Sequence, residues 1–147
     1  MEIVLTISKD NVYTEVAKTT SYTGAKMSDE DAYNRIFTTE EDGNMLDRFW
    51  NESKIAVCGN LAKLLFAEDE ANGTWRLTLN VSSAFDDNLR QSMQQSLFSF
   101  FVANITAKWY VFTNKDDVET YVNEAIAYID DIKKKAYNKK KPVRPKF

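Results

Sequence analysis

Residues 82–112, SSAFDDNLRQSMQQSLFSFFVANITAKWYVF, decide the fold expected for this chain of 147 residues. Large apolar side chains recur at every fourth position along this stretch: Phe85, Leu89, Met93, Leu97, Phe101, Ile105 and Trp109. Phe98, Val102 and Phe112 widen the apolar stripe towards its end, which is typical of an amphipathic helix that becomes buried on most sides. At 1.5 Å per residue such a helix would be roughly 45 Å long. We therefore predict that it runs through the middle of a single core.

Two further long helices are predicted on either side of this stretch. The first begins at Thr38 or Thr39, directly before three acidic residues that favour the positive end of a helix dipole. Its apolar face extends to about residue 66: Leu46, Trp50, Ser53, Val57, Leu61 and Leu64. The second begins at Asn114 and has this apolar face: Val118, Val122, Ala125, Ile129 and Ile132. Spacings of three and four residues in both segments indicate helices packed on one side.

Alternating patterns predict a small amount of β-structure. Residues 2–7 and 12–18 alternate apolar and polar side chains around a polar turn, which favours an N-terminal β-hairpin over residues 2–18. Because an isolated hairpin is marginal in water, it is expected to lie on the helices or to pair with a strand of another chain. Residues 75–81, WRLTLNV, predict one further short strand after the turn pair at residues 72–73.

The segments between these elements complete the predicted fold. Residues 19–27, TTSYTGAKM, are polar and are interpreted as a loop, and Ser28 is expected to cap a short helix that buries Tyr33, Ile36 and Phe37. The fold class is therefore mainly α: a bundle of three long helices with an N-terminal β-hairpin and one further short strand. These elements form one domain of residues 1–132, followed by an extended basic C-terminal arm of residues 133–147.

The charge of the chain is divided unevenly between this domain and the arm. Eight basic residues and no acidic residue lie in the arm: Lys133, Lys134, Lys135, Lys139, Lys140, Lys141, Arg144 and Lys146. The first 132 residues carry 11 basic and 22 acidic side chains. Pro142 and Pro145 exclude continued helix near the end of the arm. This asymmetry predicts an acidic body joined to a basic segment that binds a partner.

The composition argues against an enzyme and predicts no cofactor or metal. The chain has no histidine, so it lacks the commonest general base and metal ligand, and it has no glycine-rich phosphate loop. Clustered acids are interpreted as helix starts and solvated loops, and Cys58 as a small buried thiol. No apolar run is long enough to cross a membrane, and the N-terminus lacks a signal-peptide pattern. We expect synthesis in the cytoplasm and no membrane association.

The surplus of aromatic residues suggests contact between subunits. Phe98, Phe100 and Phe101 face more than one direction on a helix, so either neighbouring helices or another subunit must cover them. We expect a homo-oligomer for this reason, although core packing is the ordinary role of such residues.

Three roles for the arm follow from its composition. It is a solvated end, it binds the phosphate backbone of nucleic acid, or it lies in an acidic groove of a neighbouring protein, including another copy of this chain. Tyr137, Val143 and Phe147 are interleaved with the charges, which a purely solvated segment does not require. The residues predicted to contact a partner are Lys139, Lys140, Lys141, Arg144, Lys146 and Phe147.

The layout from residue 28 to residue 147 resembles the small head-tail connector, or adaptor, proteins of tailed phages and their prophage relatives. It has a helical entry at residues 29–53, DEDAYNRIFTTEEDGNMLDRFWNES, and a middle helix. It ends with a final helix and arm at residues 125–145, AIAYIDDIKKKAYNKKKPVRP.

The resemblance implies a non-enzymatic component of the virion that forms a ring at the portal and contacts portal or tail proteins through the arm. The alternative from another class is a nucleic-acid-associated protein that binds DNA phosphates through the same basic segment without reading sequence.

Overall fold

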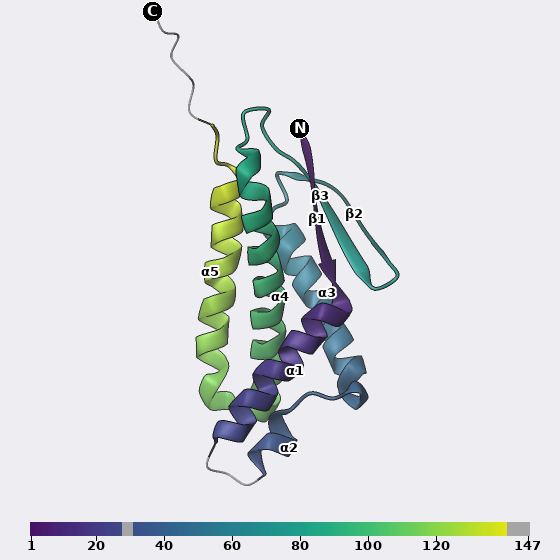
Figure 1. Cartoon of the computed structure of the whole chain (residues 1–147), viewed down its shortest axis with the longest axis vertical. Helices are drawn as coiled ribbons and strands as arrows, with labels where there is room; N and C mark the ends of the chain where they lie inside the picture. Colours follow the sequence, from purple (N-terminus) through teal and green to yellow (C-terminus); the bar gives the residue numbers. More distant parts are fainter. Residues whose placement is uncertain (28–30, 141–147) are drawn as a thin grey trace, which may run out of the picture.

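The computed structural model describes residues 1–27 and 31–140. Figure 1 shows long helices arranged around a central one, with a small sheet against one side of the bundle. The strands and α-helices are β1 (Glu2–Ser8), α1 (Lys9–Lys26), α2 (Ala32–Ile36), α3 (Gly43–Asn60), β2 (Leu65–Ala71), β3 (Thr74–Asn80), α4 (Arg90–Thr113) and α5 (Val118–Ala136). Short 3-10 turns precede three of the helices: η1 (Glu40–Asp42), η2 (Asp87–Leu89) and η3 (Lys115–Asp117).

Helix α4 is the central element, as predicted. Helix α5 packs antiparallel along one side of it, while α1, α3 and β1 contact its other sides (Figure 1). The helix begins at Arg90, eight residues after the start of the stretch whose sequence predicts it, so a cap for it at Ser82 or Ser83, which that sequence suggests, is wrong. Residues 82–86 form an irregular segment that buries Phe85, and the side chain of Asp86 accepts a hydrogen bond from the main chain of Asn88 at the start of η2.

The three strands form one antiparallel sheet in the order β1-β3-β2. Strand β3 is the predicted strand, and β1 pairs with it along its whole length. The sheet buries one face against the helices: Ile3, Leu5, Ile7, Trp75, Leu77 and Leu79. Asn72 and Gly73 join β2 to β3 with φ angles of 54° and 75°, which are typical of the two-residue turns that suit a hairpin. Strand β1 therefore pairs within the chain.

The predicted N-terminal hairpin and the loop after it are wrong, because residues 9–26 form the single helix α1. Four positions spaced by four residues are buried on one side of this helix: Val12, Val16, Thr20 and Gly24. Val12 and Val16 suit either a strand or a helix, because a spacing of four residues satisfies both periods. Ser8 accepts a hydrogen bond from the main-chain amide of Asn11 and begins the helix directly after β1.

The short helix predicted after the loop is present as α2, although its predicted cap, Ser28, lies outside the described residues. Ile36 is buried as expected, Phe37 is half-buried and Tyr33 is exposed. Helix α2 crosses α1 at Gly24, where an added Cβ atom would lie 2.7 Å from the Cα atom of Tyr33. Glycine at this position therefore permits the close contact between α1 and α2.

The helix predicted to reach residue 66 ends at Asn60, and residues 65–71 form the edge strand β2. The prediction missed β2 because its sequence, LFAEDEA, is acidic and lacks clear alternation. Two indole nitrogens stabilise this strand. Trp75 donates to Glu68 and Trp50 donates to Glu70, each over 2.5 Å.

The last helix continues four residues beyond the predicted end of the domain. Helix α5 runs to Ala136, so Lys133, Lys134 and Lys135 are helical and do not belong to an extended arm. Cationic side chains in the last turn of a helix lie near the negative end of its dipole and stabilise it. The three long helices predicted from the sequence are therefore present as α3, α4 and α5, with shifted ends, and α1 is a further helix of 18 residues.

Candidate partner-binding surfaces

Main-chain contacts hold the start of the C-terminal segment against the residues that precede α4. Lys139 forms an isolated antiparallel bridge with Phe85, and the main-chain amide of Lys140 donates to the carbonyl oxygen of Ala84 over 2.7 Å. The side chains of Lys139 and Lys140 are exposed. The other residues predicted to contact a partner lie outside the described residues: Lys141, Arg144, Lys146 and Phe147.

Part of the positive charge in the last turn of α5 is paired within the protein. The ammonium group of Lys135 donates to Asp131 over 2.6 Å and to Ser92 on α4 over 2.5 Å. Partial burial alone would raise the pKa of Asp131, but the hydrogen bonds from Lys135 and Ser96 hold it below its ordinary value. Lys134 is exposed and, with Lys139 and Lys140, leaves a basic surface at this end of the molecule.

The aromatic residues of α4 are mostly core and not surface. Phe100 and Phe101 are buried, and the ring centroid of Phe101 lies 4.8 Å from that of Trp50 and 5.5 Å from that of Trp75. Phe98 is half-buried and packs against the core. These three phenylalanines are therefore covered mainly within the chain, whereas Val111 and Phe112 at the end of α4 are exposed.

One exposed apolar surface lies on α5. Val122 and Ile126 are one helical turn apart, and 40% and 52% of their surfaces are exposed. The side of α5 that faces α4 instead carries Ala125, Ile129 and Ile132, which are buried. We call Val122 and Ile126 the α5 patch.

A second exposed apolar surface lies on α3 and β2. Ile55 on α3 is 72% exposed and Phe66 on β2 is 61% exposed. Cys58, Ile55 and Glu68 help to line a groove of about 640 Å³ between these two elements. Burial and the nearby carboxylate of Glu68 raise the pKa of the Cys58 thiol, so it stays protonated near neutral pH and is a poor nucleophile. Phe66 is not among the residues that line this groove. We call the apolar side chains Ile55, Cys58 and Phe66 of these two elements the α3–β2 patch.

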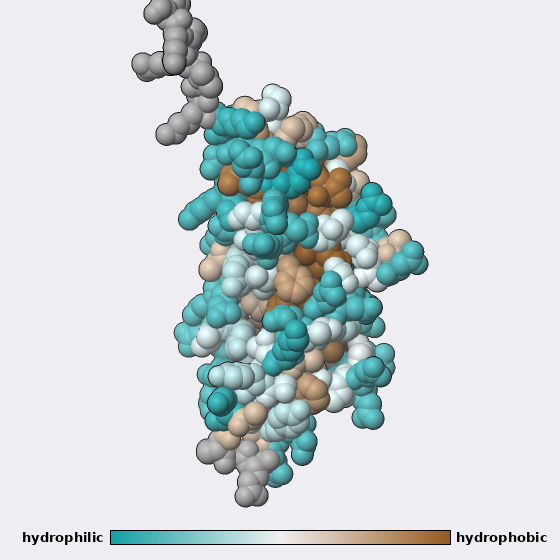
Figure 2. Space-filling view, viewed as in Figure 1, coloured by the Kyte–Doolittle hydropathy of each residue, from teal (hydrophilic) through white to brown (hydrophobic). Residues whose placement is uncertain are grey.

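These two patches belong to elements on different sides of the central helix. Helix α5 packs against one side of α4, whereas β2 lies at the outer edge of the sheet on the other side (Figure 1). Figure 2 shows that polar residues cover most of one face of the molecule and that apolar residues gather on it between the sheet and α4. The exposed apolar surface is thus divided into separate patches.

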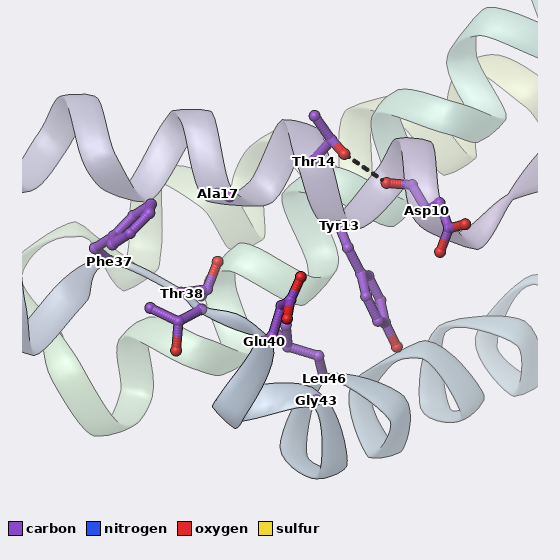
Figure 3. Close-up of a pocket in the computed structure, with 10 residues that line it drawn as sticks. Asp10, Tyr13, Thr14, Ala17, Phe37, Thr38, Glu40, Gly43 and Leu46 are labelled. Atoms are coloured by element: carbon purple, nitrogen blue, oxygen red, sulfur yellow. Dashed lines mark hydrogen bonds between the residues drawn. The ribbon is translucent and has the colours of Figure 1, made fainter.

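A groove of about 530 Å³ lies between α1 and the segment that joins α2 to α3. Its walls include Tyr13 and Ala17 from α1, and Phe37 and Leu46 from the other side, with Asp10 at one end and Glu40 between Phe37 and Leu46 (Figure 3). No basic side chain belongs to the described residues that line it. We call this the α1–α3 groove.

One wall of the α1–α3 groove is held by a hydrogen-bonded cluster. The hydroxyl of Tyr13 donates to Asp47 on α3 over 2.5 Å, and Lys9 forms an ion pair with the same carboxylate at 2.9 Å. Burial and this carboxylate raise the pKa of Tyr13 far above its ordinary value. Partial burial would raise the pKa of Asp47, but the bonds from Tyr13 and Lys9 lower it. The cluster fixes the distance between α1 and α3.

No group of three or more cysteine or acidic side chains within residues 1–27 and 31–140 is arranged to hold a metal ion. In the same part of the chain, none of the helices combines the length and the apolar character needed to span a membrane. Comparison with known proteins finds no matching family, no similar curated protein and no similar solved structure.

Proposed function

We propose that this chain is a non-enzymatic structural subunit that assembles side by side into a ring and contacts a further protein through its basic C-terminal segment. The class of protein that combines these properties, and that the layout of the chain resembles, is the head-tail connector of tailed phages and prophages. Its place would be in the virion, at the portal. The observation that carries the proposal is the pair of exposed apolar patches on elements at different sides of α4.

Two different patches on one subunit favour a head-to-tail contact. In such a contact the α5 patch of one copy packs on the α3–β2 patch of the next copy, and the operation repeats until a ring closes. A two-fold contact would need only one self-complementary patch. Burial of Val122, Ile126, Ile55 and Phe66 would supply apolar area that the single subunit leaves in water.

The C-terminal segment supports the second half of the proposal. It begins at the bridge between Lys139 and Phe85, so each copy in a ring would present its basic end on the same face. The acidic body and the basic segment have opposite charges, which steers the segment towards acidic protein surfaces.

Light scattering of the purified chain over micromolar to millimolar concentrations tests the side-by-side contact. The measured mass is expected to rise above that of one chain as the protein concentration increases. Ile55→Asp and Ile126→Asp should each form smaller assemblies than wild type at the same concentration, because each introduces a charge into one patch. Tyr22→Asp is the matched control, since Tyr22 is 68% exposed on α1 outside both patches and its replacement should leave assembly unchanged.

A mixture of the two variants gives the decisive result. An Ile55→Asp copy keeps its α5 patch and an Ile126→Asp copy keeps its α3–β2 patch, so the mixture should regain one side-by-side contact that each variant alone lacks, without reaching the mass of the wild-type assembly. A wild-type chain that stays monomeric throughout, or an Ile126→Asp variant that assembles like wild type, would contradict the ring.

A specific observation also favours the second candidate, a protein that binds nucleic acid. Lys134, Lys139 and Lys140 form an exposed basic surface at one end of the molecule. If this surface neutralises phosphates, binding to duplex DNA of any sequence should weaken steeply as salt increases. Replacement of these three lysines by glutamine should then weaken DNA binding, reduce its dependence on salt and leave the mass of the protein alone unchanged.

A further inference from the structure

We propose that the α1–α3 groove receives the C-terminal residues 141–147 of a second copy of this chain. The inference rests on the proposed function, because it names the surface on which the basic segment docks. It adds a contact between copies that is separate from the one between the α5 patch and the α3–β2 patch.

The chemistry of the groove suits a segment that is both basic and apolar. Tyr13, Phe37 and Leu46 offer aromatic and aliphatic surface within it, and Asp10 and Glu40 line it with carboxylates (Figure 3). Among the described residues, neither of these carboxylates forms an ion pair with a basic side chain. Aromatic side chains in a groove bind proline-containing peptides, and nearby carboxylates bind the basic side chains of such peptides.

The sequence of the C-terminal segment is complementary to this groove. Residues 141–147 read KPVRPKF, so basic side chains alternate with proline, valine and phenylalanine. Each proline restricts its own φ angle, which lowers the conformational entropy that the segment loses when it binds. Arg144 and Lys146 match the two carboxylates in charge, while Val143 and Phe147 match the apolar floor.

The geometry of the bundle favours a second copy over the same chain as the source of the segment. Lys140 is held beside Ala84, ahead of the first turn of α4. The groove residue Phe37 follows Ile36, whose carbonyl oxygen accepts a hydrogen bond from Trp109 near the other end of α4. That end lies roughly 30 Å from the start of α4. Seven residues span at most about 24 Å when fully extended, so the segment of the same chain would not reach the Phe37 end of the groove.

Binding of a labelled peptide with the sequence of residues 138–147, NKKKPVRPKF, to the full-length protein tests the inference by fluorescence anisotropy. The double variant Asp10→Lys/Glu40→Lys should weaken binding by about tenfold or more, because two attractive contacts become repulsive. Asp69→Lys is the matched control, since Asp69 is an exposed acid on β2 that does not line the groove, and it should leave affinity unchanged. A peptide with Val143→Ser and Phe147→Ser keeps its charge and should bind at least about tenfold more weakly.

A second measurement locates the peptide without relying on groove variants. Amide chemical shifts of the wild-type protein should move at Thr14, Ala17 and Gly43, which line the groove. Shifts confined to other surfaces, an unchanged affinity in the double variant, or a peptide that binds duplex DNA but not the protein would each overturn the inference.

The Ile126→Asp variant separates this inference from the proposed function. It lacks the side-by-side contact but has an intact groove, so it should bind the peptide as tightly as wild type does. If the peptide does not bind the groove while Ile55→Asp and Ile126→Asp still prevent assembly, the inference fails and the ring remains supported. If neither variant affects assembly but the peptide binds the groove, the side-by-side ring fails and the groove stands.

Discussion

The indole nitrogen of Trp50 on α3 donates a hydrogen bond to the carboxylate of Glu70 on β2 over 2.5 Å. The other oxygen of this carboxylate accepts from Lys54, also on α3, over 3.0 Å. Trp50 is buried, whereas the side chains of β2 are mostly exposed. One acidic side chain thus ties the edge strand of the sheet to a helix and satisfies a polar atom of the core.

Glu70→Ala should lower the free energy of unfolding by about 2 kcal/mol, because it leaves the Trp50 indole without its acceptor and removes the partner of Lys54. Glu70→Gln keeps an oxygen acceptor and should lose about half as much. Asp69→Asn is the control, because Asp69 is exposed and its ion pair with Arg76 is long, at 4.0 Å. Urea unfolding monitored by tryptophan fluorescence measures all three. Equal losses for Glu70→Ala and Asp69→Asn would contradict this role for Glu70.

Gly24→Ala should lower the free energy of unfolding by about 2 kcal/mol, since the new Cβ atom would lie 2.7 Å from the main chain of α2 at Tyr33. Gly59→Ala is a matched change in another helix. No atom lies within 4 Å of an added Cβ at Gly59, so the same substitution should stabilise the protein by about 0.5 kcal/mol. Thermal unfolding followed by circular dichroism compares the two variants. Similar shifts of the same sign would show that α1 and α2 do not approach closely at Gly24.

Thr106→Val should raise the free energy of unfolding by about 1 kcal/mol. Among the described residues, the buried hydroxyl of Thr106 on α4 has no hydrogen-bond partner, and valine removes the hydroxyl at nearly constant volume. Thr20→Val is the control, because the Thr20 hydroxyl accepts from the amide of Thr38 and donates to the carbonyl of Val16. That variant should be destabilised. Destabilisation of Thr106→Val would show that its hydroxyl is satisfied in solution.

Stability should decrease as the pH falls below about 4.5, the ordinary range of carboxyl groups. Partial burial alone would raise the pKa of Glu70, but the bonds from Lys54 and Trp50 lower it, and the hydrogen bond from Lys108 lowers the pKa of Glu52. A carboxyl whose pKa is lower in the folded state stabilises that state above its unfolded pKa. This contribution is lost as the pH falls through the folded pKa. Urea unfolding from pH 7 to pH 3 measures the loss.

Glu70→Gln removes one of these groups, so its stability should depend less on pH than that of wild type over the same interval. A variant with the same pH dependence as wild type would show that Glu70 has an ordinary pKa in the folded protein.

Periodic segments were predictable because their spacing repeats over many turns. The apolar stripe of α4 repeats over several helical turns, and apolar and polar side chains alternate along β3. Segment ends were less predictable. The apolar spacing that includes Phe85 starts before α4, yet residues 82–86 are irregular and Asp86 caps the 3-10 turn that leads into the helix.

The candidate site was predicted only in part. The sequence identified the basic segment, and the structure describes Lys139 and Lys140 at the point where it leaves the body. The sequence does not identify the α1–α3 groove, because its patterns predict a strand over residues 12–18 and a buried side chain at Phe37. The groove forms only when α1 and the α2–α3 segment pack together. The spacing of residues along the chain does not give the distance between these two elements.

The sequence alone determined the local features of this protein. Four-residue spacing specifies the central helix, the Asn72–Gly73 pair specifies the turn with positive φ angles, and the lysines specify a basic C-terminal end. Only the tertiary structure decided that residues 9–26 are helical, that the acidic residues 65–71 form a strand, and that the sheet order is β1-β3-β2. The physical reason is that helix spacing and turn geometry arise between neighbours in the chain. The stability of β2, by contrast, comes from pairing with β3 and from the hydrogen bond between Glu70 and the distant Trp50.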